Sequence, residues 1–315
     1  MATQKAYRLH SYGGPECIQL DDVPVPTPAS SEILVAVGAV SLNPIDWKIR
    51  EGHVRDVFHI DLPKILGVDF VGTVVALGEG STSFKIGDRV MAFSDSLEAF
   101  AEHIAVPETI VSRVPASLSD IDAASLPIPA VTAWTTLHYA GEVHSGMKIL
   151  IHGASGVVGA FAVQFAKASG AFVIGTASAK NRGYVMSLGA DEFVDYQTEK
   201  FEDRAKNIDL VLDYVQIGGS MDTTARSWGT LKPGGAFVTA ADPALLGNVP
   251  EGFKGFFPRI ATNPAALERI AEQVATGHIK SKVARVFPRG ELVQAMEMNK
   301  SGGVAGRLVV DFKRV

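Results

Sequence analysis

Cysteine is nearly absent from this sequence, since Cys17 is the only one among 315 residues. One thiol can form neither an intrachain disulfide nor a thiolate metal cluster, so a disulfide-stapled secreted fold is excluded. The eight histidines are scattered, and no two of them have the spacing that puts metal ligands on one face of a helix. The sequence therefore contains no ready set of metal ligands.

Charge of one sign and long apolar runs are also lacking. The formal net charge is −5, and the lysines and arginines form no basic stripe, which argues against nucleic acid as a partner. No run of about 18 apolar residues occurs, so we expect no membrane-spanning segment. The start of the chain has neither the apolar centre of a signal peptide nor an Arg-rich amphipathic presequence. We therefore expect a cytoplasmic protein without a membrane partner.

The length of the chain suggests about two domains, each large enough to bury its own core. Residues 1–122 contain short apolar or alternating runs between turns rich in Gly and Pro. This pattern is typical of a compact, partly open β-barrel. Residues 44–51 are the exception, because Asn43 followed by Pro44 predicts the start of a helix.

From about residue 123 the pattern changes, and strand-like runs alternate with helical segments. This alternation predicts a parallel, doubly wound sheet. The last apolar run, residues 307–312, can return to the barrel. We therefore predict an α/β chain in which residues 1–122 with 286–315 form the barrel and residues 123–285 bind a dinucleotide. A cleft between these two domains would hold the substrate.

Residues 148–182 resemble one βαβ unit of the dinucleotide-binding kind. A glycine at 156 lets the backbone approach a pyrophosphate, a glycine at 159 lets the helix pack on the strand, and the tight-turn position is Ala154. Free N–H groups at the start of the helix would then bind the anion. The alternative is an ordinary tight connection. The predicted cofactor-binding residues of this turn are Gly153, Ala154, Ser155, Gly156, Val157, Val158 and Gly159.

The end of the second strand of this unit indicates which dinucleotide binds. An NAD site places an acidic residue about 20 residues after the glycines, but no acid occurs here before Asp191. Ser178, Lys180 and Arg182 can instead donate to a 2′-phosphate and neutralise it, which favours NADP(H). The alternative is that the two cations only form the solvated face of a helix.

Six further stretches carry a family resemblance. They are YGGPECIQLDDVPVPTP at 12–28, SLNPIDWKIREG at 41–52, LGVDFVGTVVALGEG at 66–80, GDRVMAF at 87–93, LPIPAVTAW at 126–134 and LKPGGAFV at 231–238. Together they resemble the medium-chain dehydrogenase/reductase superfamily, in its zinc-independent quinone oxidoreductase branch. The resemblance implies a GroES-like barrel domain and a Rossmann-type domain. It also implies hydride transfer to a quinone or to the C=C bond of an enone or enal.

The resemblance also locates the positions where zinc-dependent relatives carry their catalytic ligands. They correspond to Asn43, to Val68 and Asp69, and to about Ile128, and these residues cannot supply the nitrogen and sulfur ligands that a catalytic zinc needs. We therefore expect no metal. Without a Lewis acid, reduction of an activated C=C bond is favoured over alcohol oxidation, because the developing charge spreads over a conjugated oxygen.

Two residues of the first domain are candidates for catalysis. By resemblance, Asn43 contacts the acceptor or the nicotinamide, and the alternative is that it only caps a helix. Asp46 lies one turn later and can orient water or Lys48, although a surface or capping carboxylate is the alternative.

The remaining candidates surround the dinucleotide. By resemblance, Thr132 lies near the nicotinamide and Tyr196 flanks the adenosine phosphate; the alternatives are an ordinary helix residue with its hydroxyl bonded backwards and a half-buried strand tyrosine. By resemblance, Val215 and Gln216 belong to the loop that faces the nicotinamide. Gln216 can donate to the ribose or narrow the pocket, and the alternative is a solvent-facing loop glutamine. Candidate pocket walls are Trp47, Phe58, Phe93, Phe256 and Phe257.

Two other functions remain open from the sequence. One is a low-turnover NADPH-binding sensor or scaffold, and the other is a zinc-type alcohol dehydrogenase. We also expect a homodimer, formed by pairing of the sheet edge near residues 236–241.

Overall fold

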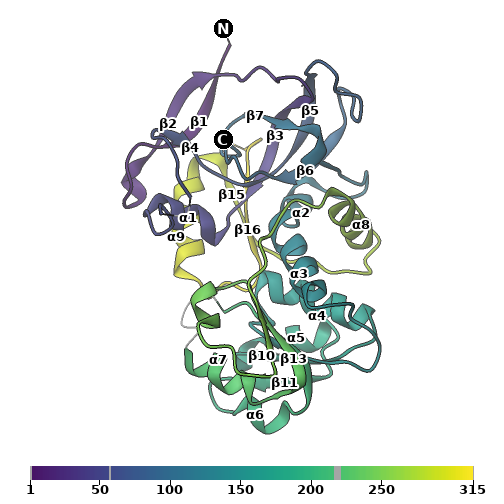
Figure 1. Cartoon of the computed structure of the whole chain (residues 1–315). Helices are drawn as coiled ribbons and strands as arrows, with labels where there is room; N and C mark the ends of the chain where they lie inside the picture. Colours follow the sequence, from purple (N-terminus) through teal and green to yellow (C-terminus); the bar gives the residue numbers. More distant parts are fainter. Residues whose placement is uncertain (1, 57, 216–220, 315) are drawn as a thin grey trace. The chain divides into compact units, whose positions relative to one another are not determined.

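The structure is a computed structural model that describes residues 2–56, 58–215 and 221–314. The chain divides into two compact units, residues 1–128 with 262–315 and residues 129–261 (Figure 1). The sequence placed these divisions at 122 and 286, so the first unit is larger than expected. The difference includes helix α8, Pro264–Ala275, because its Pro264 carbonyl accepts a hydrogen bond from Ser112 Oγ of the first unit at 3.0 Å.

The first unit consists mainly of antiparallel strands. Two sheets have the strand orders β2-β1-β4 and β15-β16-β3-β5-β6-β8, and β7 also pairs with β3. The strands are β1 Thr3–Leu9, β2 Ile18–Pro24, β3 Glu32–Ser41, β4 Lys64–Ile65, β5 Asp69–Leu77, β6 Arg89–Phe93, β7 His103–Pro107, β8 Ser112–Arg113, β15 Val283–Pro288 and β16 Arg307–Asp311. The helices, besides α8, are α1 Pro44–Arg50, α2 Asp120–Ala124 and α9 Leu292–Ser301.

Two local predictions in this unit are confirmed. Helix α1 begins at Pro44 with Asn43 as its N-cap. The last strand returns to the sheet, since β16 pairs antiparallel with β3 and Val310 lies opposite Val40. Residues from both ends of the chain therefore form one layer.

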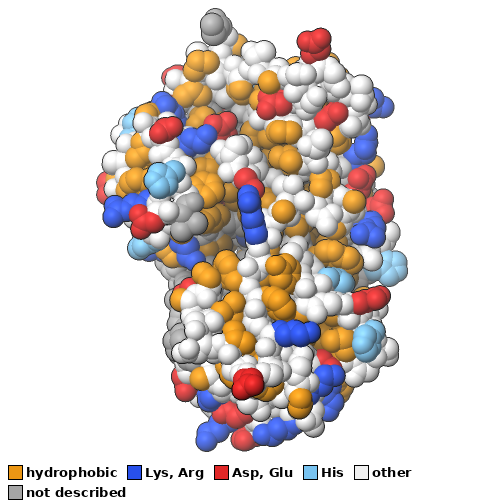
Figure 2. Space-filling view, in the orientation of Figure 1, with side chains coloured by type: hydrophobic (Ala, Val, Ile, Leu, Met, Phe, Trp, Pro, Cys, Tyr) orange, Lys and Arg blue, Asp and Glu red, His pale blue; other side chains and the backbone are white. Residues whose placement is uncertain are grey.

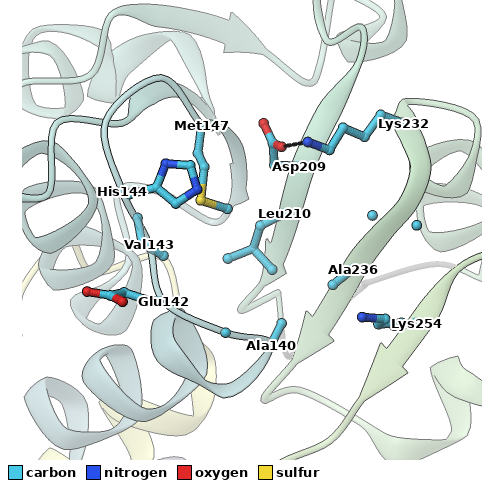
Figure 3. Close-up of a pocket in the computed structure, with 13 residues that line it drawn as sticks. Ala140, Glu142, Val143, His144, Met147, Asp209, Leu210, Lys232, Ala236 and Lys254 are labelled. Carbon is cyan, nitrogen blue, oxygen red and sulfur yellow. Dashed lines mark ion pairs between the residues drawn. The ribbon is translucent and has the colours of Figure 1, made fainter.

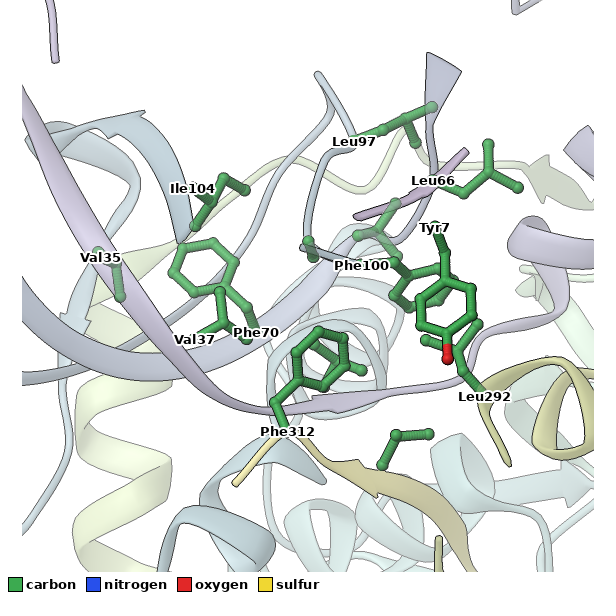
Figure 4. Packing of buried hydrophobic residues seen from close by; sticks show 14 of the residues in the cluster. Tyr7, Val35, Val37, Leu66, Phe70, Leu97, Phe100, Ile104, Leu292 and Phe312 are labelled. Carbon is green, nitrogen blue, oxygen red and sulfur yellow. The ribbon is translucent and has the colours of Figure 1, made fainter. Parts of the chain in front are cut away.

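The core of the first unit is aromatic and aliphatic (Figure 4). Phe70 and Phe100 are fully buried, and Phe312 packs in the same cluster. Gly67 makes this packing possible, because a Cβ at this position would lie 2.3 Å from the Phe100 ring and because its φ of +92° suits glycine. This packing anchors the segment that leads into β5.

The second unit contains a parallel sheet with the strand order β11-β10-β9-β12-β13-β14. The strands are β9 Lys148–His152, β10 Phe172–Ala177, β11 Glu192–Asp195, β12 Ile208–Asp213, β13 Leu231–Thr239 and β14 Lys254–Phe256. The helices that contribute to this unit are α3 Pro127–Tyr139, α4 Val157–Ala168, α5 Arg182–Ser187, α6 Phe201–Arg204 and α7 Met221–Trp228. In chain order the strands are arranged 3-2-1-4-5-6, the order of a dinucleotide-binding sheet. The doubly wound prediction is confirmed, and the order reverses between β9 and β12.

The predicted sheet edge near residues 236–241 is wrong. β13 pairs with β12 on one side and with β14 on the other, where Ala236 lies opposite Lys254. The edge strand at this side of the sheet is therefore β14. Its three residues are too few to give a periodic pattern in the sequence.

The surface carries both signs of charge. On the face that Figure 2 draws, acidic and basic side chains are interspersed with apolar ones. Within the described residues, no helix is long and apolar enough to cross a membrane.

Candidate functional site

The turn after β9 is the centre of the site in the second unit. Gly153 follows β9 and has a φ of +72°, so the left-handed residue of the tight turn is Gly153 rather than position 154. Ala154 is fully buried, and its N–H donates to the Thr176 carbonyl of β10 at 3.0 Å. The turn is therefore fastened to the neighbouring strand.

The absence of a side chain has a different consequence at each of two further glycines, Gly159 and Gly156. A Cβ on Gly159 would lie 2.2 Å from the Gly153 oxygen, so only glycine lets α4 pack against the turn. At Gly156, the N-cap of α4, a Cβ would meet only the Gly153 oxygen at 3.2 Å among the described atoms. This side of the turn is therefore open to the approach of a ligand, as the sequence predicts.

The first turn of α4 presents hydrogen-bond donors. The N–H groups of Val157, Val158 and Gly159 begin a 12-residue helix and have no partner within it. Ser155 precedes them, while the Gly156 N–H is already bonded to the Gly153 oxygen at 2.9 Å. With the positive end of the helix dipole, these donors have the arrangement that suits an anion such as a diphosphate.

The end of β10 is tied to this turn by a residue that sequence reasoning missed. Asn181 Nδ2 donates to Ser155 Oγ and to Ser178 Oγ, both at 3.2 Å. Lys180 is exposed and forms no ion pair within the described part of the chain. The Arg182 guanidinium lies 5.4 Å from the centre of the Phe193 ring, which holds its side chain near the same strand end. Two cations that form no ion pair with any described residue therefore follow β10.

Tyr196 and Val215 lie at the same end of the sheet. Tyr196 follows β11, and its side chain is 61% exposed rather than half-buried in a strand. The Tyr196 N–H donates to the Ala177 carbonyl at 3.4 Å, which places it beside the end of β10. Val215 lies next to Gly153, since its Cγ2 is 3.4 Å from the position of a Cβ on that glycine. Gln216 lies outside the described residues.

His152, the last residue of β9 before the turn, is buried, and its role was not predicted from the sequence. His152 Nδ1 lies 3.1 Å from Thr176 Oγ1, and Nε2 lies 3.0 Å from Ser227 Oγ. Because Ser227 donates its own hydrogen to the Thr223 carbonyl, His152 Nε2 must carry the hydrogen of that contact. Burial lowers the pKa of His152 to about 4, so the ring is neutral at physiological pH.

A hydrogen bond between Thr136 and Tyr214 links helix α3 to the end of β12. Thr136 Oγ1 donates to the Thr132 carbonyl at 2.8 Å and contacts the Tyr214 hydroxyl at 2.6 Å. The hydroxyl that bonds backwards along this helix thus belongs to Thr136, and Thr132 is buried. Next to Tyr214, burial raises the pKa of Asp213 to about 6, although it accepts a hydrogen bond from Val215 N–H at 3.1 Å.

Asn43 belongs to a second polar group, in the first unit, and only 2% of its surface is exposed. Its Oδ1 accepts a hydrogen bond from Arg307 Nη2 at 2.6 Å, and its Nδ2 donates to Asp69 Oδ2 at 3.0 Å and to the Ser41 carbonyl at 3.5 Å. We refer to Ser41, Asn43, Asp46, Asp69 and Arg307 as the Asn43 cluster. The Asn43 amide is therefore engaged on both of its ends within this cluster.

A buried ion pair holds the Asn43 cluster together. Arg307 Nη2 lies 2.5 Å from Asp69 Oδ2, and Ser41 Oγ donates to the same oxygen at 3.0 Å. The other oxygen of Asp69 accepts from Ile128 N–H at 3.2 Å. Burial raises the pKa of Asp69 above its usual value, against the opposing effect of Arg307. Arg307 was missed from the sequence, because it is 264 residues from Asn43 and no local pattern links them.

Asp46 is fully buried and is not a surface carboxylate. Its Oδ2 accepts a hydrogen bond from the Asn43 N–H at 2.6 Å, so it caps the first turn of α1. Burial, and then the nearby Asp69 charge, raises the pKa of Asp46 to about 8. Its Oδ1 has no hydrogen-bond partner among the residues that the structure describes. Asp46 therefore carries a proton through most of the neutral pH range.

The Asn43 cluster does not fit a zinc ion. Val68 and Ile128 offer only apolar side chains, and Asp69 and Asn43 are committed to Arg307. Over the described ranges, no three His, Cys, Asp or Glu side chains are grouped to hold a metal ion.

The five candidate wall residues are divided between the two units. Phe93 is buried in the first unit, and Trp47 and Phe58 pack against the core there. Phe256 lies on β14, where its ring meets the Tyr139 ring edge-on at 5.3 Å, and Phe257 next to it is exposed.

A Rossmann-type sheet with this turn is typical of a dinucleotide-binding protein, and comparisons with known proteins identify the class as oxidoreductases. Residues 29–116 match the alcohol dehydrogenase GroES-like domain family, and residues 188–310 match the zinc-binding dehydrogenase family. The human mitochondrial NAD(P)H oxidoreductase RTN4IP1 is 32% identical over 326 residues, covering 89% of this chain and 82% of the relative. A chloroplastic quinone-oxidoreductase homolog of Spinacia oleracea is 36% identical over 228 residues, covering 70% and 68%.

Solved structures give the same result over nearly the whole chain. The quinone oxidoreductase of Coxiella burnetii has a TM-score of 0.89 at 32% identity and covers 98% of this chain and 99% of its own. The Escherichia coli quinone oxidoreductase complexed with NADPH has a TM-score of 0.86 at 27% identity, with the same coverage. The chain belongs to the medium-chain dehydrogenase/reductase superfamily, in its quinone oxidoreductase-like group, and is an NAD(P)-binding oxidoreductase.

Proposed function

We propose that this protein is a zinc-independent, NADPH-dependent reductase of a quinone or of the C=C bond of an enone or enal. The observation that carries the proposal is the end of β10. Lys180 and Arg182 form no ion pair there with any described residue, and no carboxylate occupies the position that would accept a ribose 2′-hydroxyl. A 2′-phosphate is the ligand group that two such cations neutralise.

The residues of the second unit fit the parts of NADPH. The N–H groups of the first turn of α4 would hold the diphosphate, and Ser178, Lys180 and Arg182 would hold the 2′-phosphate. In this assignment Tyr196 flanks the adenosine end, while Thr132 and Val215 lie toward the nicotinamide. When bound, the cofactor supplies a hydride.

The chemistry of the first unit favours an acceptor that needs no Lewis acid. An enone or quinone spreads its developing charge over a conjugated oxygen, which hydrogen-bond donors suffice to stabilise. In our proposal Asn43 and Asp46 position the segment next to the acceptor, and the Asn43 amide keeps its bonds to Arg307 and Asp69. Supporting the C=C alternative, a trans-enoyl reductase of Aspergillus japonicus, himH, is 30% identical over 315 residues and covers 90% of each chain.

The test is NADPH consumption with a panel of quinones and 2-alkenals, compared with NADH. Lys180→Ala should raise KM for NADPH about tenfold and change KM for NADH less than about twofold, because one charge-assisted contact to the 2′-phosphate is lost. Lys206→Ala, an exposed lysine of the same unit, is the control and should change neither value. Equal changes with both cofactors would contradict the assignment of Lys180.

The same assay separates the competing functions. Tight NADPH binding without turnover of any acceptor would favour a sensor or scaffold. Stoichiometric zinc in the purified protein would favour an alcohol dehydrogenase.

We also propose a homodimer and a cytoplasmic location, without nucleic acid or a membrane as partner. The exposed backbone of the short edge strand β14 supports pairing with a second copy. A monomeric mass in solution would contradict the dimer. The spinach and human relatives are described as chloroplastic and mitochondrial, so fluorescence microscopy of the tagged protein in its own cells tests the location.

A further inference from the structure

The second unit contains a cavity at the opposite end of its sheet from the dinucleotide turn (Figure 3). Its volume is about 210 Å³. It lies where β12, β13 and β14 begin, whereas the turn follows the end of β9. The five residues of β9 separate the two ends by about 16 Å at 3.3 Å per residue. The cavity is therefore independent of the proposed cofactor site.

The floor of the cavity is apolar. Val143, Leu210 and Ala236 are buried, and the Met147 side chain completes the wall. Gly234 and Gly235 lie at one side and leave backbone without side chains there. An apolar cavity of about 150 Å³ accepts a benzene ring. This one therefore has room for a single ring and a small polar substituent.

The acidic groups near the cavity do not require a cationic ligand. Asp209 pairs with Lys232, and its Oδ2 also accepts the Lys148 N–H at 2.7 Å. Figure 3 shows the Glu142 carboxylate extending away from the cavity. Neither carboxylate is therefore an unpaired group that faces the space.

Two basic groups of the rim, Lys254 and His144, are not in an ion pair with any described residue. Lys254 forms no ion pair or hydrogen bond with any described residue, and its side chain lies beside Ala236 in Figure 3. His144 Nδ1 lies 3.0 Å from the Ser145 carbonyl, which can only accept, so Nδ1 carries the hydrogen and Nε2 remains open. The Lys254 ammonium at the rim matches the carboxylate of an aromatic acid, the His144 Nε2 offers a further polar contact, and the apolar floor matches the ring.

We propose that this cavity binds a small aromatic monocarboxylate, with the ring on Leu210 and Ala236 and the carboxylate on Lys254. The ligand is recognised by its charge and its single ring, so benzoate and phenylacetate are the probes. Benzamide is the neutral comparison, because it has the same ring without the charge.

The experiment is calorimetric titration of the purified full-length protein with each probe. Benzoate or phenylacetate should bind with a Kd on the order of 1 mM, as expected for about ten ligand atoms. Lys254→Gln should weaken binding of the acids about tenfold and leave benzamide unchanged, because it removes one charge-assisted contact. Lys206→Gln, an exposed lysine outside the cavity lining, should have no effect.

Two further variants locate the binding. Ala236→Val narrows the floor and should weaken the acids and benzamide alike, whereas Lys180→Ala should leave all three unchanged. No saturable binding of either acid up to about 10 mM, more than enough to fill a site of this Kd, would overturn the proposal. Binding that is insensitive to Lys254→Gln, or that is lost in Lys180→Ala, would overturn it as well, since the acid would then occupy another site.

Discussion

The Asn43 cluster and the turn at residues 153–159 are both polar, yet they use their hydrogen-bonding groups in opposite ways. In the cluster, Asn43, Asp69 and Arg307 donate to and accept from one another and are almost fully buried. In the turn, the N–H groups at the start of α4 have no partner within the helix. Polar groups that satisfy one another stabilise the fold, and those that do not are available to a ligand.

Breaking the buried ion pair tests the structural side of this comparison and should have the largest effect. Arg307→Met leaves Asp69 buried without its cation and should lower the free energy of unfolding by about 4 kcal/mol. Lys5→Met removes the cation of an exposed pair with Asp22 and should cost less than about 1 kcal/mol. Urea denaturation followed by circular dichroism measures both. Similar midpoints for the two variants would show that the cluster does not stabilise the unit.

Lowering the pH should reduce the free energy of unfolding, because His152 is buried in its neutral form next to the turn. The folded-state pKa of His152, about 4, lies below its ordinary value of 6.5, so the unfolded chain binds this proton more readily. The stabilisation is complete above pH 6.5 and is lost as the pH falls toward 4, by about 2 kcal/mol at pH 5. His152→Gln keeps a hydrogen-bonding side chain but does not titrate. Its loss of stability between pH 7.5 and 5 should be smaller than that of the unaltered protein by this ~2 kcal/mol, and equal losses would contradict the role of His152.

The sequence predicted the turn more completely than the cluster, because the two differ in how far apart their residues lie along the chain. The glycines at 153, 156 and 159 are close neighbours, and a strand, a helix and a second strand surround them in order. Lys180 and Arg182 were predicted from their distance along the chain, about 20 residues after those glycines. Arg307 reaches Asn43 only because β16 returns to β3, and no local pattern contains that pairing.

Local sequence patterns also could not predict which polar side chains are buried or which distant residues they contact. For Asp46 the sequence left open a role in orienting water or Lys48 and a surface or capping carboxylate, and its position in the helix correctly indicated a cap. Its pKa also depends on the charges of Asp69 and Arg307, which other strands supply. Asn181 was missed for the same reason, since its partner Ser155 is 26 residues away.

Displacing the start of α4 from the turn should weaken NADPH binding while the rest of the molecule stays folded. Gly159→Ala places a Cβ 2.2 Å from the Gly153 oxygen, so α4 and its N–H donors must shift. We expect NADPH to bind at least about 100-fold more weakly, because several anion contacts weaken together. Gly183→Ala in α5 meets no atom within 4 Å and is the control. Unchanged NADPH affinity in Gly159→Ala, measured by cofactor fluorescence, would show that the diphosphate lies elsewhere.

The smallest effect concerns the one atom of the Asn43 cluster that its described neighbours leave unsatisfied, Asp46 Oδ1. The folded-state pKa of Asp46, about 8, lies far above its ordinary value, so the folded protein binds this proton more tightly and stability falls as the pH rises through 8. Between pH 7 and 9 the loss should be about 1 kcal/mol. Asp46→Asn keeps an oxygen for the Asn43 N–H and removes the titration, so the loss of stability between pH 7 and 9 should disappear. Asp56→Asn, at an exposed site, is the control and should retain that loss.

The same variant tests whether Asp46 takes part in the reaction. If Asp46 only positions the segment, Asp46→Asn also keeps its NADPH consumption. A drop of more than about 100-fold with unchanged stability would instead make Asp46 a proton donor or acceptor in the reaction, because general acid–base catalysis contributes on that scale.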